Sequence, residues 1–111
     1  MTPLVYIAGP MTGYTNQNRG LFFAVEESLR LKGIGAINPA RLNPVTRSWA
    51  ACMVVCLWHL RLADAVALLP GWERSRGARW EVAAAVLLGL PLHLVVLDPI
   101  RLTDAPPTVI H

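Results

Sequence analysis

One stretch of the sequence combines a lone acid with a site suited to anions. It runs from Leu68 to Glu81 and contains an apolar segment, a Pro-Gly turn, Ser75 and an apolar helical pattern that carries Glu81. A serine hydroxyl and free backbone N–H groups at a helix start bind anions. A lone carboxylate beside such a site, facing a pocket, can act as a nucleophile or base. The stretch therefore predicts chemistry on a nucleotide or sugar phosphate.

The composition supplies ample material for the core of one domain, expected over residues 1–111. The chain is 54% hydrophobic and 15% charged, with a mean hydropathy of +0.44. Its longest apolar run, Val82 to Leu97, is broken by Gly89-Leu90-Pro91, whereas a membrane span needs ~20 continuous apolar residues. We therefore expect no membrane span, and we interpret the excess apolarity as a strand buried on both faces and a subunit interface.

Charge and cysteine usage narrow the expected partners and compartment. Ten basic and seven acidic residues leave a net charge of +3, which suits an anionic small molecule. The sequence has no basic run interleaved with aromatic residues, a pattern that would indicate a nucleic-acid polymer as the ligand. The N-terminus enters an apolar run without a basic segment, so we expect no signal peptide. Cys52 and Cys56 share one face of a helical pattern and do not resemble a disulfide framework, which favours a reducing cytoplasm.

Apolar periodicity predicts strands that alternate with helices. The expected strands cover 3–8, 34–37, 64–69 and 90–97, and the expected helices cover 19–32, 48–62 and 75–88. This order with short connections indicates a parallel sheet with right-handed crossovers and helices on both faces. We predict a three-layer Rossmann- or flavodoxin-like α/β fold with a four- to five-stranded parallel sheet. A polar loop over 40–47 and an extended C-terminal arm over 100–111 complete the expected chain.

The loops beyond the carboxyl ends of the strands contain the candidate site. In an open α/β sheet ligands bind at that edge, near the point where the strand order reverses. The loops expected there cover 9–18, 39–47 and 70–75. Because Ser75 ends the last loop and Glu81 follows it by less than two helical turns, the fold would bring the anion site and the acid to one edge of the sheet.

Two blocks of the sequence resemble the nucleoside 2-deoxyribosyltransferase superfamily. The first is YIAGPMTGY, from Tyr6 to Tyr14. The second begins with DAVALLPGW at Asp64 and continues with the Ser75-x-Gly77-Ala78-x-x-Glu81 pattern and LGLP at 88–91. The likeness extends from Leu4 to about Leu97 and is nearest to the small bacterial and phage proteins grouped as DUF4406. The second block, in its strand–helix setting, is the more specific.

The resemblance implies cleavage of the N-glycosidic bond of 2′-deoxynucleosides or their 5′-monophosphates, with the sugar passed to another base or to water. Glu81 matches the glutamate that attacks the anomeric carbon, and Ser75 and Gly77 match the residues that hold a 5′-phosphate. The first block is implied to line the sugar and base pocket through Tyr6, Gly9, Met11 and Thr12. The resemblance also implies a homodimer or higher homo-oligomer, and a bacterial or phage-infected bacterial cell.

Cys56 departs from the pattern of the active relatives. These usually carry an aspartate eight residues before the aspartate that opens the third strand. With Asp64 at that opening, the position holds Cys56. The relatives' aspartate steers a sugar hydroxyl or helps to protonate the leaving base, and a thiol is a poor acid or base at neutral pH. Asp64 is itself a candidate second catalytic carboxylate, with an ordinary bond to loop backbone as the alternative.

Each candidate residue also has a purely structural interpretation. Glu81 could complement the helix dipole, Ser75 could simply cap the helix, and Tyr6 could be a core aromatic. Of the basic residues Arg74, Arg76 and Arg79, we expect at least two to form a solvated face.

Several further side chains are expected to have structural roles. Asn16 and Asn18 are expected to form turns, and Trp72 and Trp80 to pack in the core or an interface. A metal held by Cys52, Cys56 and His59 of one helix would lack a fourth ligand, so we expect neither a metal nor another cofactor.

The sequence favours an enzyme over two other classes of protein. An oxocarbenium-like transition state is stabilised or captured by a carboxylate, and the apolar neighbours of Glu81 would partly desolvate it. We therefore predict an N-glycosidase of (2′-deoxy)nucleoside 5′-monophosphates or related nucleotides, which releases or transfers the base. The alternatives are a catalytically weak nucleotide-binding protein, for example one that sequesters a nucleotide signal, and an interaction protein with a vestigial pocket.

Overall fold

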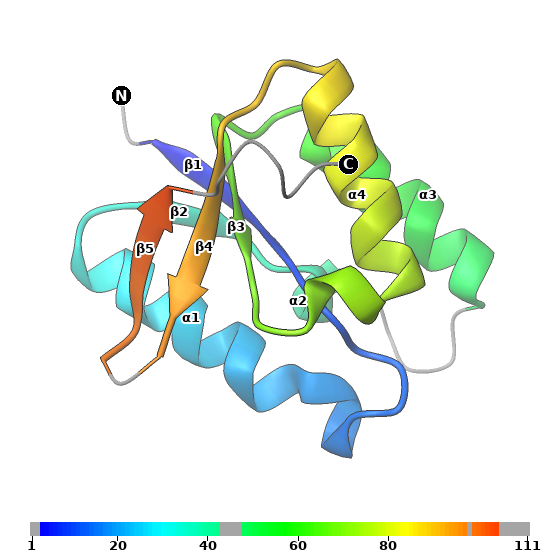
Figure 1. Ribbon diagram of the computed structural model, residues 1–111, viewed down its shortest axis with the longest axis horizontal. Coiled ribbons are helices and arrows are strands. Elements are labelled where there is room, and N and C mark those ends of the chain that lie inside the picture. Colours follow the sequence, from blue (N-terminus) through cyan, green and yellow to red (C-terminus); the bar gives the residue numbers. More distant parts are fainter. Residues whose placement is uncertain (1–2, 43–47, 98, 105–111) are drawn as a thin grey trace.

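The computed structural model in Figure 1 describes residues 3–42, 48–97 and 99–104 and contains a five-stranded sheet. The order of the strands across the sheet is β2-β1-β3-β4-β5. In chain order the strands are β1 (Leu4–Ala8), β2 (Gly35–Ile37), β3 (Ala65–Leu68), β4 (Leu92–Val96) and β5 (Arg101–Asp104). The four strands predicted from the sequence are all present, each within the expected range.

Within the described residues, four α-helices and two short 3-10 helices connect the strands. They are η1 (Thr15–Asn18), α1 (Arg19–Leu31), α2 (Pro39–Leu42), α3 (Trp49–Leu60), η2 (Trp72–Arg74) and α4 (Arg76–Leu87). The predicted starts of α3 and α4 are confirmed, because the Ser48 and Ser75 hydroxyls accept hydrogen bonds from the backbone N–H groups three residues later. Both serines are therefore N-caps.

The predicted polar loop over 40–47 was wrong at its beginning. Residues 39–42 form the short helix α2, and 43–47 lie outside the described residues. The Asn38 side chain accepts a hydrogen bond from the Ala40 N–H at 2.9 Å, and Pro39 occupies the first helical position, where proline is favoured. The Asn-Pro pair therefore both closes β2 and starts a helix.

The fifth strand adds one antiparallel pair to the predicted parallel sheet. Pairs β1–β2, β1–β3 and β3–β4 are parallel, whereas β4 and β5 are antiparallel, with Val96 opposite Arg101. Only residues 97–100 connect β4 to β5, and a parallel crossover needs a dozen or more residues. The expected C-terminal arm thus begins as a sheet strand, and its end, 105–111, lies outside the described residues.

The sheet is the middle of three layers, as predicted (Figure 1). Because successive strand residues point to opposite faces, Val5 and Ile7 of β1 pack with the α1 residues Phe22 and Val25. Tyr6 instead belongs to the second core cluster, which joins the sheet to α3 and α4.

The strand order reverses between β1 and β3, and this point creates the crevice that the fold uses for ligands. β1 leads into α1 on one face, while β3 leads into α4 on the other. The two loops pack closely at the start of the crevice, since a Cβ atom added at Gly9 would lie 2.6 Å from the Leu69 Cβ. A side chain at position 9 would separate the loops.

Apolar side chains remain exposed on α3 and α4. Trp58 is 61% exposed, and Val54 and Leu87 are exposed as well. The whole of α3, from Trp49 to Leu60, contains no Asp, Glu, Lys or Arg. Within the part of the chain that the structure describes, none of the helices combines the length and apolar character needed to cross a membrane.

Candidate active site

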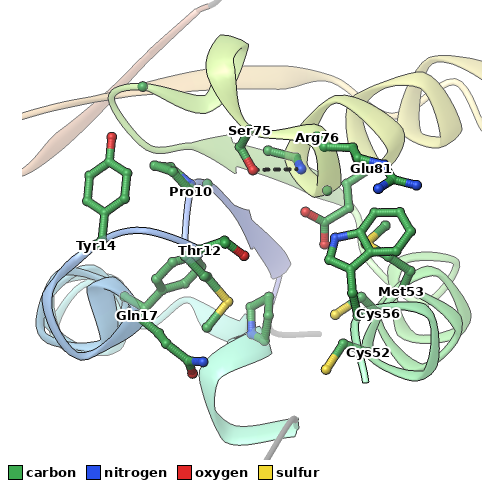
Figure 2. Close-up of a pocket in the computed structure, with 18 of the residues that line it drawn as sticks. Pro10, Thr12, Tyr14, Gln17, Cys52, Met53, Cys56, Ser75, Arg76 and Glu81 are labelled. Atoms are coloured by element: carbon green, nitrogen blue, oxygen red, sulfur yellow. Dashed lines mark hydrogen bonds between the residues drawn. The ribbon is translucent and has the colours of Figure 1, made fainter. Parts of the chain in front are cut away.

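A cavity of about 500 Å³ opens at the carboxyl edge of the sheet, and Figure 2 shows its walls. The loop after β1 forms one side, the first turns of α3 form another, and η2 and the start of α4 form the third. Small-molecule sites typically have volumes of ~300–1,000 Å³. The predicted residues that line it are Gly9, Met11, Thr12, Ser75, Gly77 and Glu81.

Glu81 is the buried acid of this cavity. It is 5% exposed and accepts a hydrogen bond from the Tyr6 hydroxyl through Oε2. Burial raises the pKa of Glu81 to about 8, although the hydrogen bond from Tyr6 acts in the opposite direction. The carboxyl group is therefore mainly protonated at neutral pH, and it becomes a carboxylate as the pH rises through about 8.

Tyr6 supports Glu81 from the core and does not line the cavity. This corrects the expectation that it contacts the sugar and base. Its side chain is fully buried, because β1 lies inside the sheet and position 6 points toward the α3–α4 layer. Burial first, and then the charge of Glu81, hold the pKa of Tyr6 well above its usual range, so the phenol stays protonated as a donor.

Asp64 lies at the other edge of the sheet, which corrects its expected place in the site. It immediately precedes β3, and this amino end is opposite the cavity. Its Oδ2 accepts a hydrogen bond from the Leu4 N–H at 2.8 Å, and its own N–H donates to the Leu4 carbonyl at 2.7 Å. Asp64 therefore ties the start of β3 to β1, in agreement with the alternative interpretation of a bond to backbone.

The first turn of α4 forms the cationic side of the cavity. Ser75 and Gly77 both line it, and α3 approaches so closely that a Cβ atom at Gly77 would lie 3.2 Å from the Met53 Sδ. The Arg76 Cζ lies 4.0 Å from the centroid of the Trp49 ring, and both residues line the cavity. An anion here would meet the helix N-terminus and the Arg76 guanidinium together.

The sequence from residue 3 to residue 94 matches the model of a family described as a domain of unknown function, DUF4406. The chain belongs to the DUF4406 family. No curated protein matches the sequence of this DUF4406 domain.

Solved structures of other proteins share the fold of the DUF4406 domain. One is a 2-deoxyribosyltransferase of Bacillus psychrosaccharolyticus, 21% identical, with a TM-score of 0.67 over 96% of this chain and 79% of the other. A conserved protein of Enterococcus faecalis V583 is 19% identical, with a TM-score of 0.69 over 89% and 66%. A 2-desoxiribosyltransferase of Leishmania mexicana is 19% identical, with a TM-score of 0.68 over 86% and 65%. The domain thus spans about two thirds of the latter two chains.

Arginine placement in the DUF4406 domain differs from expectation. Arg74 and Arg76 are exposed to solvent but line the cavity, while Arg79 is exposed and does not line it. Two of the three arginines therefore add positive charge to the site, although at most one was expected to do so. Among the described residues that line the cavity, Glu81 is the only acidic one.

The α3 wall adds three cavity residues that the sequence did not predict, together with Cys56, which the resemblance had placed at the position of a catalytic aspartate. Trp49, Cys52, Met53 and Cys56 line the cavity from this helix. Cys56 is buried and belongs to the same core cluster as Tyr6. The spacing of the two cysteines indicates that they share a face of the helix, but not that this face lines the cavity.

Asn16, Asn18 and Trp72 have structural roles in this DUF4406 domain, whereas Trp80, expected in the core or an interface, does not pack in the core. Asn16 and Asn18 adopt positive φ angles of 48° and 62° in a turn. Trp72 is buried in the core, and Trp80 is exposed outside the cavity. Among the described residues no group of three or more His, Cys, Asp or Glu side chains could hold a metal ion.

Proposed function

We propose that this DUF4406 domain is an N-glycosidase of (2′-deoxy)nucleoside 5′-monophosphates or related nucleotides, with Glu81 as the nucleophile. One observation carries the proposal: a buried carboxyl group faces a cavity of ligand size whose adjoining helix start is cationic. The 2-deoxyribosyltransferase fold of the two structures named above agrees with sugar transfer chemistry.

Glu81 has the surroundings that the proposed reaction needs. In the first step a carboxylate oxygen bonds to the anomeric carbon while the bond from that carbon to the base nitrogen breaks, and the base leaves with the electron pair and takes a proton from solvent. Water or a second base then displaces the carboxylate from the sugar. The hydrogen bond from buried Tyr6 fixes the carboxyl group, so little ordering is left for the reaction itself.

The charges around the cavity support a phosphorylated substrate. Arg74 and Arg76 carry positive charge, and Glu81 is mainly neutral at pH 7 because burial raises its pKa to about 8. The Ser75 hydroxyl caps α4, whose N-terminal N–H groups favour an anion. A 5′-phosphate would satisfy both features, whereas an uncharged nucleoside would leave them unused.

A panel of nucleosides and their 5′-monophosphates, in deoxy and ribo forms, tests this proposal. Base release is followed by HPLC, and release from at least one monophosphate at a higher kcat/KM than from its nucleoside is expected. Equal or better release from the nucleosides would contradict the assignment of a phosphate to the start of α4.

Nucleotide binding without turnover is the second candidate function. It is favoured by the protonated state of Glu81 at neutral pH and by Cys56, a weak acid–base group, beside it on the cavity wall. Thermal stabilisation by one nucleotide of the panel, with no base release up to pH 9, would establish this function instead. The open cavity disfavours the third possibility, a vestigial pocket.

We also propose that two copies of the chain associate through the outer faces of α3 and α4. The exposed apolar side chains there include Trp58, and α3 itself carries no Asp, Glu, Lys or Arg.

The variant Trp58→Glu is expected to lower the mass in solution, measured by light scattering, to that of a monomer. Leu31 on α1, 73% exposed on the other side of the sheet, provides the matched control. Leu31→Glu should leave the mass unchanged, and a wild-type monomer would contradict the association.

A further inference from the structure

Trp49 and Arg76 form a stacked pair that joins two helix starts at the cavity. Trp49 is the first residue of α3 and Arg76 the first residue of α4, and the Arg76 Cζ lies 4.0 Å from the centroid of the Trp49 ring. Both residues line the cavity, and both are exposed, Trp49 by 39%. Figure 2 shows Arg76 and Ser75 together at the start of α4. The pair therefore bridges α3 and α4 beside the space that a ligand would occupy.

The close packing of α3 on α4 brings the indole to this place. A Cβ atom added at Gly77 would lie 3.2 Å from the Met53 Sδ and 3.7 Å from the Trp49 Nε1. The second distance is an ordinary van der Waals contact, so the indole also lies against the Gly77 backbone. The ring is therefore packed on the first turn of α4, where it meets the Arg76 side chain.

Stacking leaves the hydrogen-bond donors of Arg76 available. At 4.0 Å no N–H group fits between the Cζ atom and the ring, so the guanidinium contacts the ring with its face, and its five donors lie in the plane of the group. The ion pairs among the described residues join Arg30 to Glu27 and Arg41 to Glu26. No carboxylate in this part of the chain therefore neutralises Arg76, and its N–H edge can bind an anionic oxygen.

We propose that Trp49 is a positioning residue that holds Arg76 for the anionic group of a ligand, and that it thereby sets the preference of the site for phosphorylated ligands. An exposed arginine samples many rotamers, and ordering it on binding costs affinity. A guanidinium already restricted by the Trp49 ring has less freedom to lose when it binds a phosphate oxygen. The inference rests on the proposed function, because it assigns the phosphate of that function to Arg76.

The test uses two sugar probes that need no knowledge of the base, 2-deoxyribose 5-phosphate and 2-deoxyribose. Binding of each is followed by titration of the Gly77 amide NMR signal. Trp49→Leu is expected to weaken binding of the phosphorylated sugar about threefold to fivefold and to leave binding of 2-deoxyribose unchanged. Trp49→Phe keeps an aromatic face and should restore most of the loss.

The matched control for loss of an aromatic ring under an arginine is Phe23→Leu. The Arg41 Cζ lies 4.7 Å from the centroid of the Phe23 ring. Phe23 belongs to α1, on the other face of the sheet, and does not line the cavity. This variant should bind both sugars as the wild type does.

A double-mutant cycle separates positioning of Arg76 from a general disturbance of the cavity. In an Arg76→Gln background Trp49→Leu should have no effect, because the ring then has no guanidinium to hold. In an Arg74→Gln background it should keep its full effect, since Arg74 lines the cavity without stacking on a ring. The arginines that do lie over aromatic rings in the described part of the chain are Arg19, Arg41, Arg61 and Arg76.

Equal losses for the two sugars in Trp49→Leu would show that the ring contacts the sugar itself and would overturn the inference. A loss that persists in full in Arg76→Gln would do the same, as would a wild type that binds the phosphorylated sugar no more tightly than 2-deoxyribose. These measurements do not involve base release, so the proposed reaction can fail while the role of Trp49 stands. Conversely, base release with a preference for monophosphates that survives Trp49→Leu would keep the proposed function and remove this role alone.

Discussion

Glu81→Gln is expected to lower the rate of base release by at least about a thousandfold while nucleotide binding persists. Glutamine has nearly the shape of glutamate, and its amide oxygen can still accept the hydrogen bond from Tyr6 that the structure gives to Oε2. The amide cannot become a carboxylate, so it neither bonds to the anomeric carbon nor balances the positive charge that develops there. The binding surface around Ser75 and Arg76 is unaffected.

The measurement combines HPLC of released base with thermal stabilisation by the same nucleotide. Asp64→Asn is the matched control, since it removes another carboxylate, at the edge of the sheet away from the cavity, and leaves an oxygen able to accept from the Leu4 N–H. Its base release should match the wild type. Substantial release by Glu81→Gln, or an equal loss in Asp64→Asn, would remove the nucleophile role from Glu81.

The predicted residues that the structure brings to the cavity are those held by local structure. Ser75, Gly77 and Glu81 lie within two turns of one helix start, so a strand, a turn and a capped helix are enough to place them. Gly9, Met11 and Thr12 follow the end of β1, and every loop after a parallel strand lies at the same edge of the sheet. Topology alone therefore brings these two groups to one cavity.

The orientations of Tyr6 and Cys56 could not be predicted, because they depend on which layer each side of β1 and α3 faces. β1 is buried on both faces, so its apolar run lacks the alternation that would have shown that Tyr6 points toward α3 and α4. α3 lacks charged residues along its length, so no polar stripe indicates that Cys56 turns toward the cavity. Asp64 is a different case, because its place at the start of a strand already implies the edge opposite the site.

The wild-type protein is expected to lose stability as the pH rises from about 4.5 to about 8. Burial raises the pKa of Glu81 in the folded state to about 8, while the unfolded chain ionises it near its ordinary pKa of 4.5. Below pH 4.5 Glu81 is protonated in both the folded and the unfolded state, so the stabilisation that it gives the fold is fully present. Between the two pKa values only the folded state keeps the proton, so the folding equilibrium constant falls about tenfold for each pH unit.

Glu81→Gln removes this pH dependence, because an amide does not ionise. Urea unfolding of both proteins at a series of pH values should give similar stabilities near pH 4.5 and an increasing advantage for the variant toward pH 8. The advantage there is expected to reach about a thousandfold in the equilibrium constant. Glu73→Gln, at an exposed glutamate of η2, should follow the wild-type curve, whereas parallel curves for wild type and Glu81→Gln would show that Glu81 is not held protonated.

The same ionisation has opposite consequences for the proposed activity and for stability. The nucleophile is the carboxylate, so base release by the wild type should rise with pH through about 8. Over the same range the stabilisation that the fold gains from protonated Glu81 is lost. An activity that rises over this range while the unfolding free energy falls, with both trends absent in Glu81→Gln, would assign the two effects to one buried group. This pairing is the trade-off expected when a site keeps a carboxyl group in apolar surroundings.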